Sequence, residues 1–153
     1  MAVIMRNFRE PDRNNYIKMS KSFYSSPAVS HYVPIQFFNE TFDLCLQKGP
    51  YVRGLIIEYD GQTAGYMLLS FTYSNEAGGM VVLIEEVLIL PEFQGKGVVS
   101  KVFDMLAEEY DSKAARYRLE VTRINNRAIE IYKHFGYTEV EYISMIRDLR
   151  EKK

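Results

Sequence analysis

Residues 85–100 read Glu-Glu-Val-Leu-Ile-Leu-Pro-Glu-Phe-Gln-Gly-Lys-Gly-Val-Val-Ser, and this stretch decides the fold. It starts near the end of an apolar run, residues 80–90, that predicts a buried central strand. A short loop with two glycines follows Pro91, and apolar residues then recur at helical spacing from Val98 to Tyr110. At such a junction, unpaired N–H groups and the positive end of the helix dipole face outward, which favours an anion.

Two common anion-binding motifs do not fit this loop. The phosphate-binding loop of NTPases has Gly-Lys followed by Ser or Thr and an earlier glycine, whereas here Gly97 follows Lys96 and Leu90 occupies the earlier position. A dinucleotide-binding fingerprint opens a strand–helix–strand unit, whereas this loop comes late, after a predicted hairpin. Taken alone, the loop is compatible with an anion site or with an ordinary turn.

Outside this stretch, the hydrophobic pattern alternates between strand and helix periods. It predicts strands at 2–8, 52–59, 63–73, 80–90 and 117–122, one or two final strands within 137–149, and helices at 11–24, 34–46, 98–110 and 126–135. Asp60-Gly61 is typical of a tight hairpin turn. We therefore expect a mixed α+β sheet with helices over it.

Size, composition and charge exclude several classes of protein. A chain of 153 residues, 47% hydrophobic and 25% charged, predicts a single globular domain over residues 1–153. The net charge of -1 provides no overall attraction to nucleic acid or to a membrane surface. Early charges such as Arg6 and Arg9 leave no room for a signal peptide, and the single Cys45 forms no internal disulfide. These features predict a cytoplasmic protein.

Neither a metal site nor a covalent nucleophile is expected. His31 and His134 have no partner at metal-ligand spacing, and Cys45 has no histidine near it in sequence. The Gly-x-Ser-x-Gly elbow of serine hydrolases is absent from the sequence.

Two blocks of the sequence resemble the GNAT superfamily of N-acetyltransferases. Leu-Pro-Glu-Phe-Gln-Gly-Lys-Gly at 90–97 is similar to the acetyl-CoA loop of that family, with Gln94 and Gly97 in place and Val99 departing from the last position. Asn-Asn-Arg-Ala-Ile-Glu-Ile-Tyr-Lys-His-Phe-Gly-Tyr at 125–137 is similar to the family's Asn-x-x-Ala … Tyr … Gly-Phe/Tyr block. The resemblance implies the GNAT-type fold, a central, mostly antiparallel sheet flanked by about four helices.

The resemblance also implies acetyl-CoA as cosubstrate, with no metal. A backbone N–H near Leu88 would polarise the thioester carbonyl, and Asn125 would contact the cofactor arm. Val99 either crowds the pyrophosphate or tilts away from it. The implied cofactor-binding residues are Val87, Leu88, Ile89, Gln94, Gly95, Lys96, Gly97, Val98, Val99, Ser100, Asn125, Ala128 and Tyr132.

Three residues are candidates for the chemistry of acetyl transfer. An alkylammonium must lose a proton before it attacks, and a carboxylate can accept that proton. Glu85 and Glu86 interrupt the apolar strand, and strict alternation would send them to opposite faces, so at most one is expected in the cleft. Likeness to polyamine acetyltransferases favours Glu85, and likeness to peptide-acetylating members makes Glu120 the second candidate. In the family the tyrosine equivalent to Tyr132 protonates the departing sulfur.

The early helices carry many aromatic side chains, and aromatic faces near a carboxylate suit a small cationic amine. The resulting prediction is direct acetyl transfer to the primary amine of a small, polyamine- or diamine-like molecule. Two alternatives stay open: a protein N-terminal or lysine acetyltransferase, and a non-catalytic acyl-CoA-binding module. Each candidate residue also has a purely structural alternative, ion pairing for the glutamates and packing for Tyr132. A homodimer is compatible with the predicted final strand.

Overall fold

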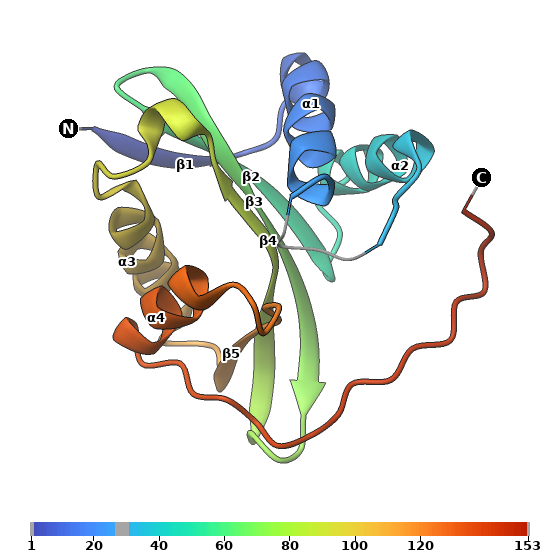
Figure 1. The fold of residues 1–153 in the computed structure, drawn as a ribbon, viewed down its shortest axis with the longest axis vertical. Coiled ribbons are helices and arrows are strands. Elements are labelled where there is room, and N and C mark those ends of the chain that lie inside the picture. Colours follow the sequence, from blue (N-terminus) through green and yellow to red (C-terminus); the bar gives the residue numbers. More distant parts are fainter. Residues whose placement is uncertain (1, 27–30, 153) are drawn as a thin grey trace.

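A computed structural model describes residues 2–26 and 31–152 of the chain (Figure 1). The strands in these residues are β1 (Val3–Asn7), β2 (Val52–Tyr59), β3 (Gln62–Ser74), β4 (Gly79–Ile89) and β5 (Arg116–Leu119). The α-helices are α1 (Arg13–Tyr24), α2 (Ile35–Leu46), α3 (Val98–Tyr110) and α4 (Asn126–His134). Short 3₁₀ helices at Glu10–Asp12 and Pro91–Phe93 precede α1 and the glycine loop. The predicted mixed α+β class with about four helices is confirmed.

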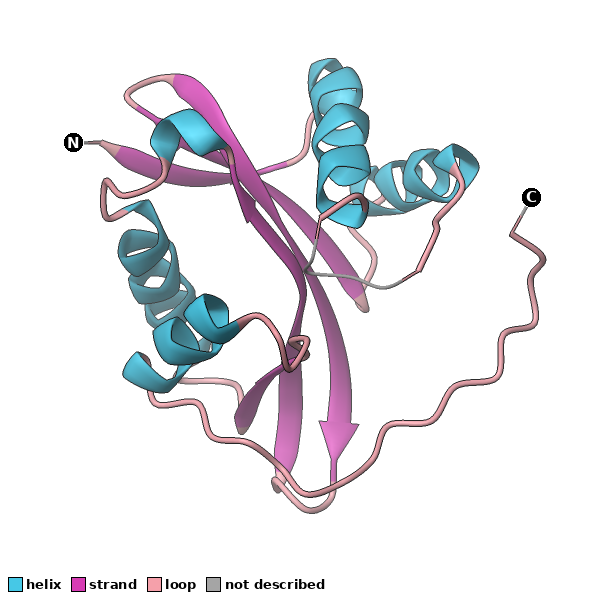
Figure 2. Ribbon diagram, viewed as in Figure 1, coloured by secondary structure: helices cyan, strands magenta, loops and turns pink. Residues whose placement is uncertain are grey.

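The five strands form one sheet in the order β1-β2-β3-β4-β5. Neighbours from β1 to β4 pair antiparallel, and β4 pairs parallel with β5. Helices α1 and α2 lie on one side of the sheet, and α3 and α4 lie on the other (Figure 2). The sheet is therefore mostly antiparallel and lies between two helical layers.

Each helical layer has its own buried core against the sheet. Under α1 and α2, Tyr16 and Phe42 pack with Ile56 and Tyr66 of the strands. On the other side, α3 buries the face that its helical spacing predicted, and the buried residues are Val98, Val102, Phe103, Leu106 and Tyr110. Burying an aliphatic or aromatic side chain of this size stabilises the fold by roughly 1.5–3 kcal/mol. This burial fixes the direction of α3, and with it the position of the glycine loop at its N-terminus.

Two irregularities of β4 shape the centre of the molecule. The register of the β3–β4 pair shifts between Leu68 and Leu69, so that Leu69 lies opposite Ile84 and Leu68 opposite Glu86. Glu85 is the extra residue of this bulge on β4. The parallel pairing with β5 covers only Val81 to Ile84. Beyond Ile84, β4 continues without β5 beside it.

The prediction of one or two final strands within 137–149 is wrong for this structure. Residues 138–149 form no strand, and the chain runs past the turn between β3 and β4 and on toward α2 (Figure 1). The apolar pattern of this segment is typical of a strand, but a strand forms only when another edge supplies hydrogen-bond partners. The described part of this chain offers the segment no such partner along its path.

Among residues 2–26 and 31–152, none of the helices combines the length and apolar character that a bilayer crossing requires. The cytoplasmic location expected from the sequence stays a prediction.

Candidate active site

A cavity of about 660 Å³ lies between β4, the glycine loop, α3 and α4. Every residue expected at the cofactor lines it except Lys96, which instead lies over the ring of Tyr59 with its Nζ 5.5 Å from the ring centroid. The sequence analysis missed several further lining residues, namely Phe93, Phe103, Arg127, Glu130, Ile131, His134 and Phe135. The two sequence blocks, far apart in the chain, therefore form the walls of one cavity.

The glycine loop is built to expose backbone N–H groups at the start of α3. Gly95 and Gly97 have φ angles of 73° and 77°, in the left-handed region where a side chain is disfavoured. The side chain of Gln94 ties the loop to the end of β4, because its Nε2 donates to the carbonyl of Ile89 at 2.9 Å. The Gly97 carbonyl accepts from the N–H of Lys101 at 3.3 Å, so the N–H groups of residues 98–100 precede the first intrahelical bond. Such a helix start suits a phosphate group.

The end of β4 offers a second row of backbone groups to the cavity. Leu90 donates its N–H to the carbonyl of Ala64 on β3, at 2.7 Å. Because N–H groups alternate along a strand, that of Leu88 also points to β3, and those of Val87 and Ile89 point to the opposite edge. Beyond Ile84, β5 does not pair with that edge of β4. The donor expected near Leu88 therefore belongs to one of its two neighbours.

Tyr132 lies on the α4 wall of the cavity. Its ring packs 5.9 Å from the ring of Phe103 and 6.0 Å from that of Tyr137, measured between centroids. Burial raises the pKa of the Tyr132 phenol above its ordinary value, so the hydroxyl keeps its proton at neutral pH. Asn125 is the N-cap of α4, and its Oδ1 accepts from the N–H of Ala128 at 3.3 Å. Asn125 thus positions the helix that carries Tyr132.

The two glutamates of β4 lie on the same face of the sheet, not on opposite faces as strict alternation predicted. Glu86 is buried against α1, where the hydroxyls of Tyr24 and Tyr66 donate to its two oxygens at 2.5 and 2.6 Å. Glu85 is exposed and accepts from the hydroxyl of Ser70 at 2.6 Å. Ser70 is one residue beyond Leu69, which faces α3, so Ser70 faces the α1 side. The bulge at Glu85 accounts for the change, because an extra residue resets the alternation.

Burial makes the carboxyl of Glu86 a weaker acid than an ordinary glutamate. It raises the pKa of the Glu86 carboxyl above its ordinary value, and the two tyrosine hydroxyls oppose this rise by stabilising the carboxylate. Burial, followed by the nearby Glu86 charge, raises the pKa of Tyr24 and Tyr66 in turn. The two phenols therefore keep their protons and donate both hydrogen bonds to the carboxyl group of Glu86.

The remaining candidate base lies apart from the cavity. Glu120 is exposed, directly follows β5, and does not line the cavity. Arg127, in the first turn of α4, was not singled out from the sequence, although its position two residues after Asn125 is a usable signal. It brings a cation to the cavity wall, and a guanidinium there favours a phosphate-bearing ligand.

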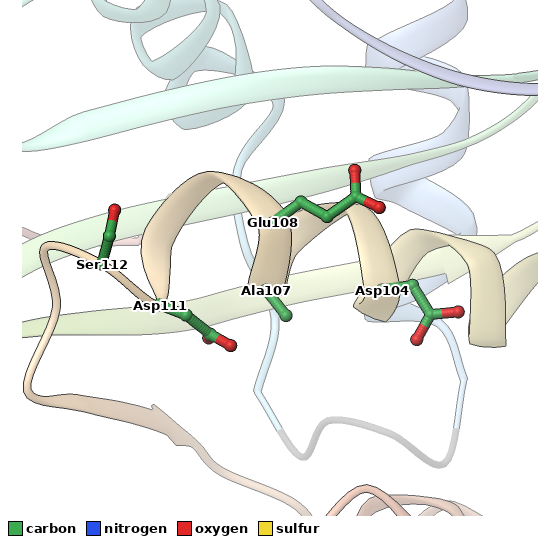
Figure 3. Close-up of a pocket in the computed structure, with 5 residues that line it drawn as sticks. All are labelled: Asp104, Ala107, Glu108, Asp111 and Ser112. Atoms are coloured by element: carbon green, nitrogen blue, oxygen red, sulfur yellow. The ribbon is translucent and has the colours of Figure 1, made fainter.

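A second hollow, of about 510 Å³, lies on the outer surface of α3 (Figure 3). Asp104, Glu108 and Asp111 surround it together with Ala107 and Ser112. Three carboxylates disfavour an anionic ligand there. No group of three or more potential metal ligands occurs among the residues that the structure describes.

Comparisons with known proteins agree with this geometry. The model of the acetyltransferase (GNAT) family matches residues 16–137. Thialysine N-epsilon-acetyltransferase of Sus scrofa is 28% identical over 144 residues, which cover 88% of this chain and 84% of that protein. A putative [ribosomal protein bS18]-alanine N-acetyltransferase of Bacillus subtilis (strain 168) is 29% identical over 133 residues, 86% of this chain and 78% of that protein. A solved structure of a possible acetyltransferase from Clostridium difficile 630 matches with a TM-score of 0.80 at 14% identity, covering 99% of this chain and 100% of that one.

Proposed function

This chain belongs to the acetyltransferase (GNAT) family, and from that premise we propose that it acetylates the primary amine of a small, polyamine- or diamine-like molecule. Membership makes the chain an acetyl-CoA-dependent N-acetyltransferase. The finer statement concerns the acceptor, and the bulge of β4 carries it. There, two adjacent carboxylates, Glu85 and Glu86, face the same side of the sheet beside aromatic residues of α1. A carboxylate pair next to aromatic rings favours a small cation.

The cavity fits acetyl-CoA as cosubstrate. In our proposal the N–H groups of residues 98–100 and the guanidinium of Arg127 bind its phosphates, and the open edge of β4 at Val87 and Ile89 binds its arm. Bound acetyl-CoA supplies an acetyl group activated as a thioester. A β4 N–H aimed at the carbonyl oxygen stabilises the negative charge that develops there, and preorganised donors of this kind often contribute more than any other group to the rate of acyl transfer.

Glu85 acts as the base in this proposal. The acceptor arrives as an ammonium with an ordinary pKa of about 10, so one proton must leave before the nitrogen lone pair can attack. Glu85 is exposed, and its Oε1 accepts from Ser70, so it is open to a ligand and held in orientation. Glu86, next to it in the chain, accepts hydrogen bonds from two phenol hydroxyls and is held buried against α1. Glu120 remains the alternative base.

Tyr132 acts as the acid in this proposal. As the new C–N bond forms and the C–S bond breaks, the phenol proton passes to the departing sulfur. A phenol with a raised pKa is a weak donor to a thiolate of pKa about 8.5, so the proton transfer must accompany C–S cleavage rather than follow it. No covalent acyl-enzyme is needed, because both substrates meet in one complex.

A protein acceptor is the second candidate. The Bacillus subtilis relative is named for the alanine of a ribosomal protein, and the pig relative for the ε-amine of thialysine. The coverage of this chain by the two relatives is similar, so the choice between them depends on the carboxylates. A small diamine can place one ammonium at Glu85 while its other end reaches solvent. A protein N-terminus carries one amine and has no second ammonium to place.

An acceptor screen tests the proposal. The full chain is mixed with acetyl-CoA and, separately, with thialysine, putrescine, spermidine and a peptide that begins with alanine, and free CoA thiol is measured. We expect the highest kcat/KM with a thialysine- or diamine-type acceptor and a loss of kcat in Glu85→Gln. A higher kcat/KM for the peptide, together with loss of activity in Glu120→Gln but not in Glu85→Gln, would establish the protein acceptor instead.

A further inference from the structure

Gly65, a buried residue of β3, leaves a space that the backbone of β4 fills. A Cβ added to Gly65 would lie 1.9 Å from the carbonyl oxygen of Leu88 and 3.1 Å from the Cα of Ile89. Even a close contact between a carbon and a carbonyl oxygen keeps them roughly 3.3 Å apart. The φ of Gly65 is not positive, so turn geometry does not account for this glycine. The close approach of β4 does, because no larger residue fits while β4 keeps its position.

The backbone of β3 is irregular immediately before Gly65. The register of the β2–β3 pair shifts between Ile57 and Glu58, and Ala64 is the extra residue on β3. The carbonyl of Ala64 accepts from the N–H of Leu90 at 2.7 Å. A bulge redirects the strand that contains it. The bulge and the glycine therefore act together to hold the end of β4 tightly against β3.

This contact fixes the orientation of the peptide unit between Leu88 and Ile89. Its carbonyl oxygen points to β3, because it occupies the space beside Gly65. In a trans peptide the N–H points away from the carbonyl, and none of the described peptide bonds is cis. The N–H of Ile89 therefore points away from β3, toward the edge of β4 that β5 does not pair with beyond Ile84. Ile89 also lines the cavity.

The carbonyl of Ile89 already has a partner at this edge. It accepts from the Nε2 of Gln94, in the glycine loop, at 2.9 Å. Within a strand the N–H and C=O of one residue point to the same edge, so this hydrogen bond agrees with the direction inferred for the N–H. Among the strands that the structure describes, none pairs with β4 at this point of its open edge. The N–H of Ile89 is thus the polar group that the edge offers to a ligand.

We propose that Gly65 is a positioning residue for acetyl-CoA, because its missing side chain keeps the Ile89 N–H aimed at an amide carbonyl of the cosubstrate arm. This inference rests on the proposed binding of the arm along the open edge of β4, and it holds for any acceptor. Gly65 itself does not line the cavity, so it acts through β4 and not by contact. An alanine at this position displaces the Leu88 carbonyl and turns the Ile89 N–H out of line.

Steady-state kinetics of Gly65→Ala in the full chain test this role. We expect KM for acetyl-CoA to rise about tenfold, as the loss of one hydrogen bond implies, while kcat and KM for the acceptor change less than about twofold. Gly54→Ala is the matched control: its Cβ would lie 2.1 Å from the ring of Phe8, in the core under α1 and α2. This control should lose stability in urea and keep its KM for acetyl-CoA. Equal KM values for acetyl-CoA in the two variants would overturn the proposal.

Amide hydrogen exchange of the unchanged chain, followed by NMR, gives a second test that does not depend on how well a variant folds. Without ligand, the Ile89 amide should exchange at least about tenfold faster than the Leu90 amide, which donates to Ala64. Saturating CoA should slow exchange at Ile89 by a similar factor. An Ile89 amide as protected as that of Leu90 without ligand, or unaffected by bound CoA, contradicts the inference and leaves the proposed function standing. A chain that binds no CoA in calorimetry overturns both.

Discussion

The glycine loop and the bulge of β4 are the two regions to which we assign function, and they are built by different means. The loop uses backbone: left-handed Gly95 and Gly97 lead into the start of α3, where residues 98–100 line the cavity. The bulge uses side chains: a one-residue register shift brings Glu85 and Glu86 to the same face. A backbone site accepts any side chains that keep its turn, whereas a side-chain site depends on what each neighbouring element supplies.

In our proposal this difference separates the region that binds acetyl-CoA from the region that selects the acceptor. Phosphate recognition by a helix start needs only glycines and free N–H groups. In our proposal the amine is recognised by carboxylates beside aromatic side chains, and α1 supplies one of these through Tyr24, whose hydroxyl donates to Glu86. The following changes sharpen the comparison, from the largest expected effect to the smallest.

Tyr132→Phe should have the largest effect, on the order of a 10³-fold fall in kcat, because general acid catalysis typically contributes 10² to 10⁴. The ring remains packed against Phe103, so KM for acetyl-CoA should change little. Steady-state kinetics by thiol release measure both constants. Tyr137→Phe is the control, since Tyr137 belongs to the same aromatic cluster and should keep full activity. Equal activity in the two variants would remove Tyr132 from the chemistry.

Glu86→Ala should destabilise the fold by about 3 kcal/mol, because the buried hydroxyls of Tyr24 and Tyr66 lose their acceptor. Urea denaturation measures this loss. Glu85→Ala is the control: Glu85 is exposed, so its removal should change the free energy of unfolding by less than about 0.5 kcal/mol while lowering kcat. The reverse pattern, with Glu85 structural and Glu86 catalytic, would invert the assignment of the two carboxylates.

The same carboxyl predicts how stability depends on pH. The folded state raises the pKa of Glu86 above its unfolded value of 4.5, so the native protein binds this proton more tightly than the unfolded chain does. The free energy of unfolding should therefore fall as pH rises from 4.5 through the raised folded pKa, and then level off. Glu86→Gln cannot titrate, and it should remove this part of the pH dependence. An unchanged pH profile in Glu86→Gln would place the titration elsewhere.

The sequence predicted the four helices, the first five strands and the conformation of the glycine loop, because these follow from local residue types. The helical spacing from Val98 to Tyr110 and the two glycines of the loop each specify a conformation by themselves. The bulge was not predictable, because a register shift depends on the pairing of β3 with β4, and no residue type in Glu85-Glu86 requires it. The final strand was wrongly predicted for a related reason: residues 138–149 have strand-like composition, but pairing needs an edge that residues 2–26 and 31–152 do not bring to them.

Gly97→Ala tests the backbone region directly. At a φ of 77° a Cβ costs roughly 1–2 kcal/mol, so we expect about a tenfold rise in KM for acetyl-CoA as the loop relaxes away from its N–H geometry. Gly49→Ala is the matched control, because an added Cβ there meets no atom within 4 Å and the backbone is not left-handed. If calorimetry shows the same acetyl-CoA affinity in both variants, the loop does not bind the phosphates through its backbone.

Val99→Ala should have the smallest effect, less than about a twofold change in KM for acetyl-CoA. Val99 occupies the position where the family pattern has a small residue, but its side chain is half-buried and packs against the core of α3 and the sheet. A side chain held against the core does not block the backbone N–H groups at the start of α3, so shortening it should change phosphate binding little. A tenfold gain in acetyl-CoA affinity in Val99→Ala, measured by calorimetry, would show that the side chain crowds the phosphates, and the loop would then depend on its side chains as the bulge does.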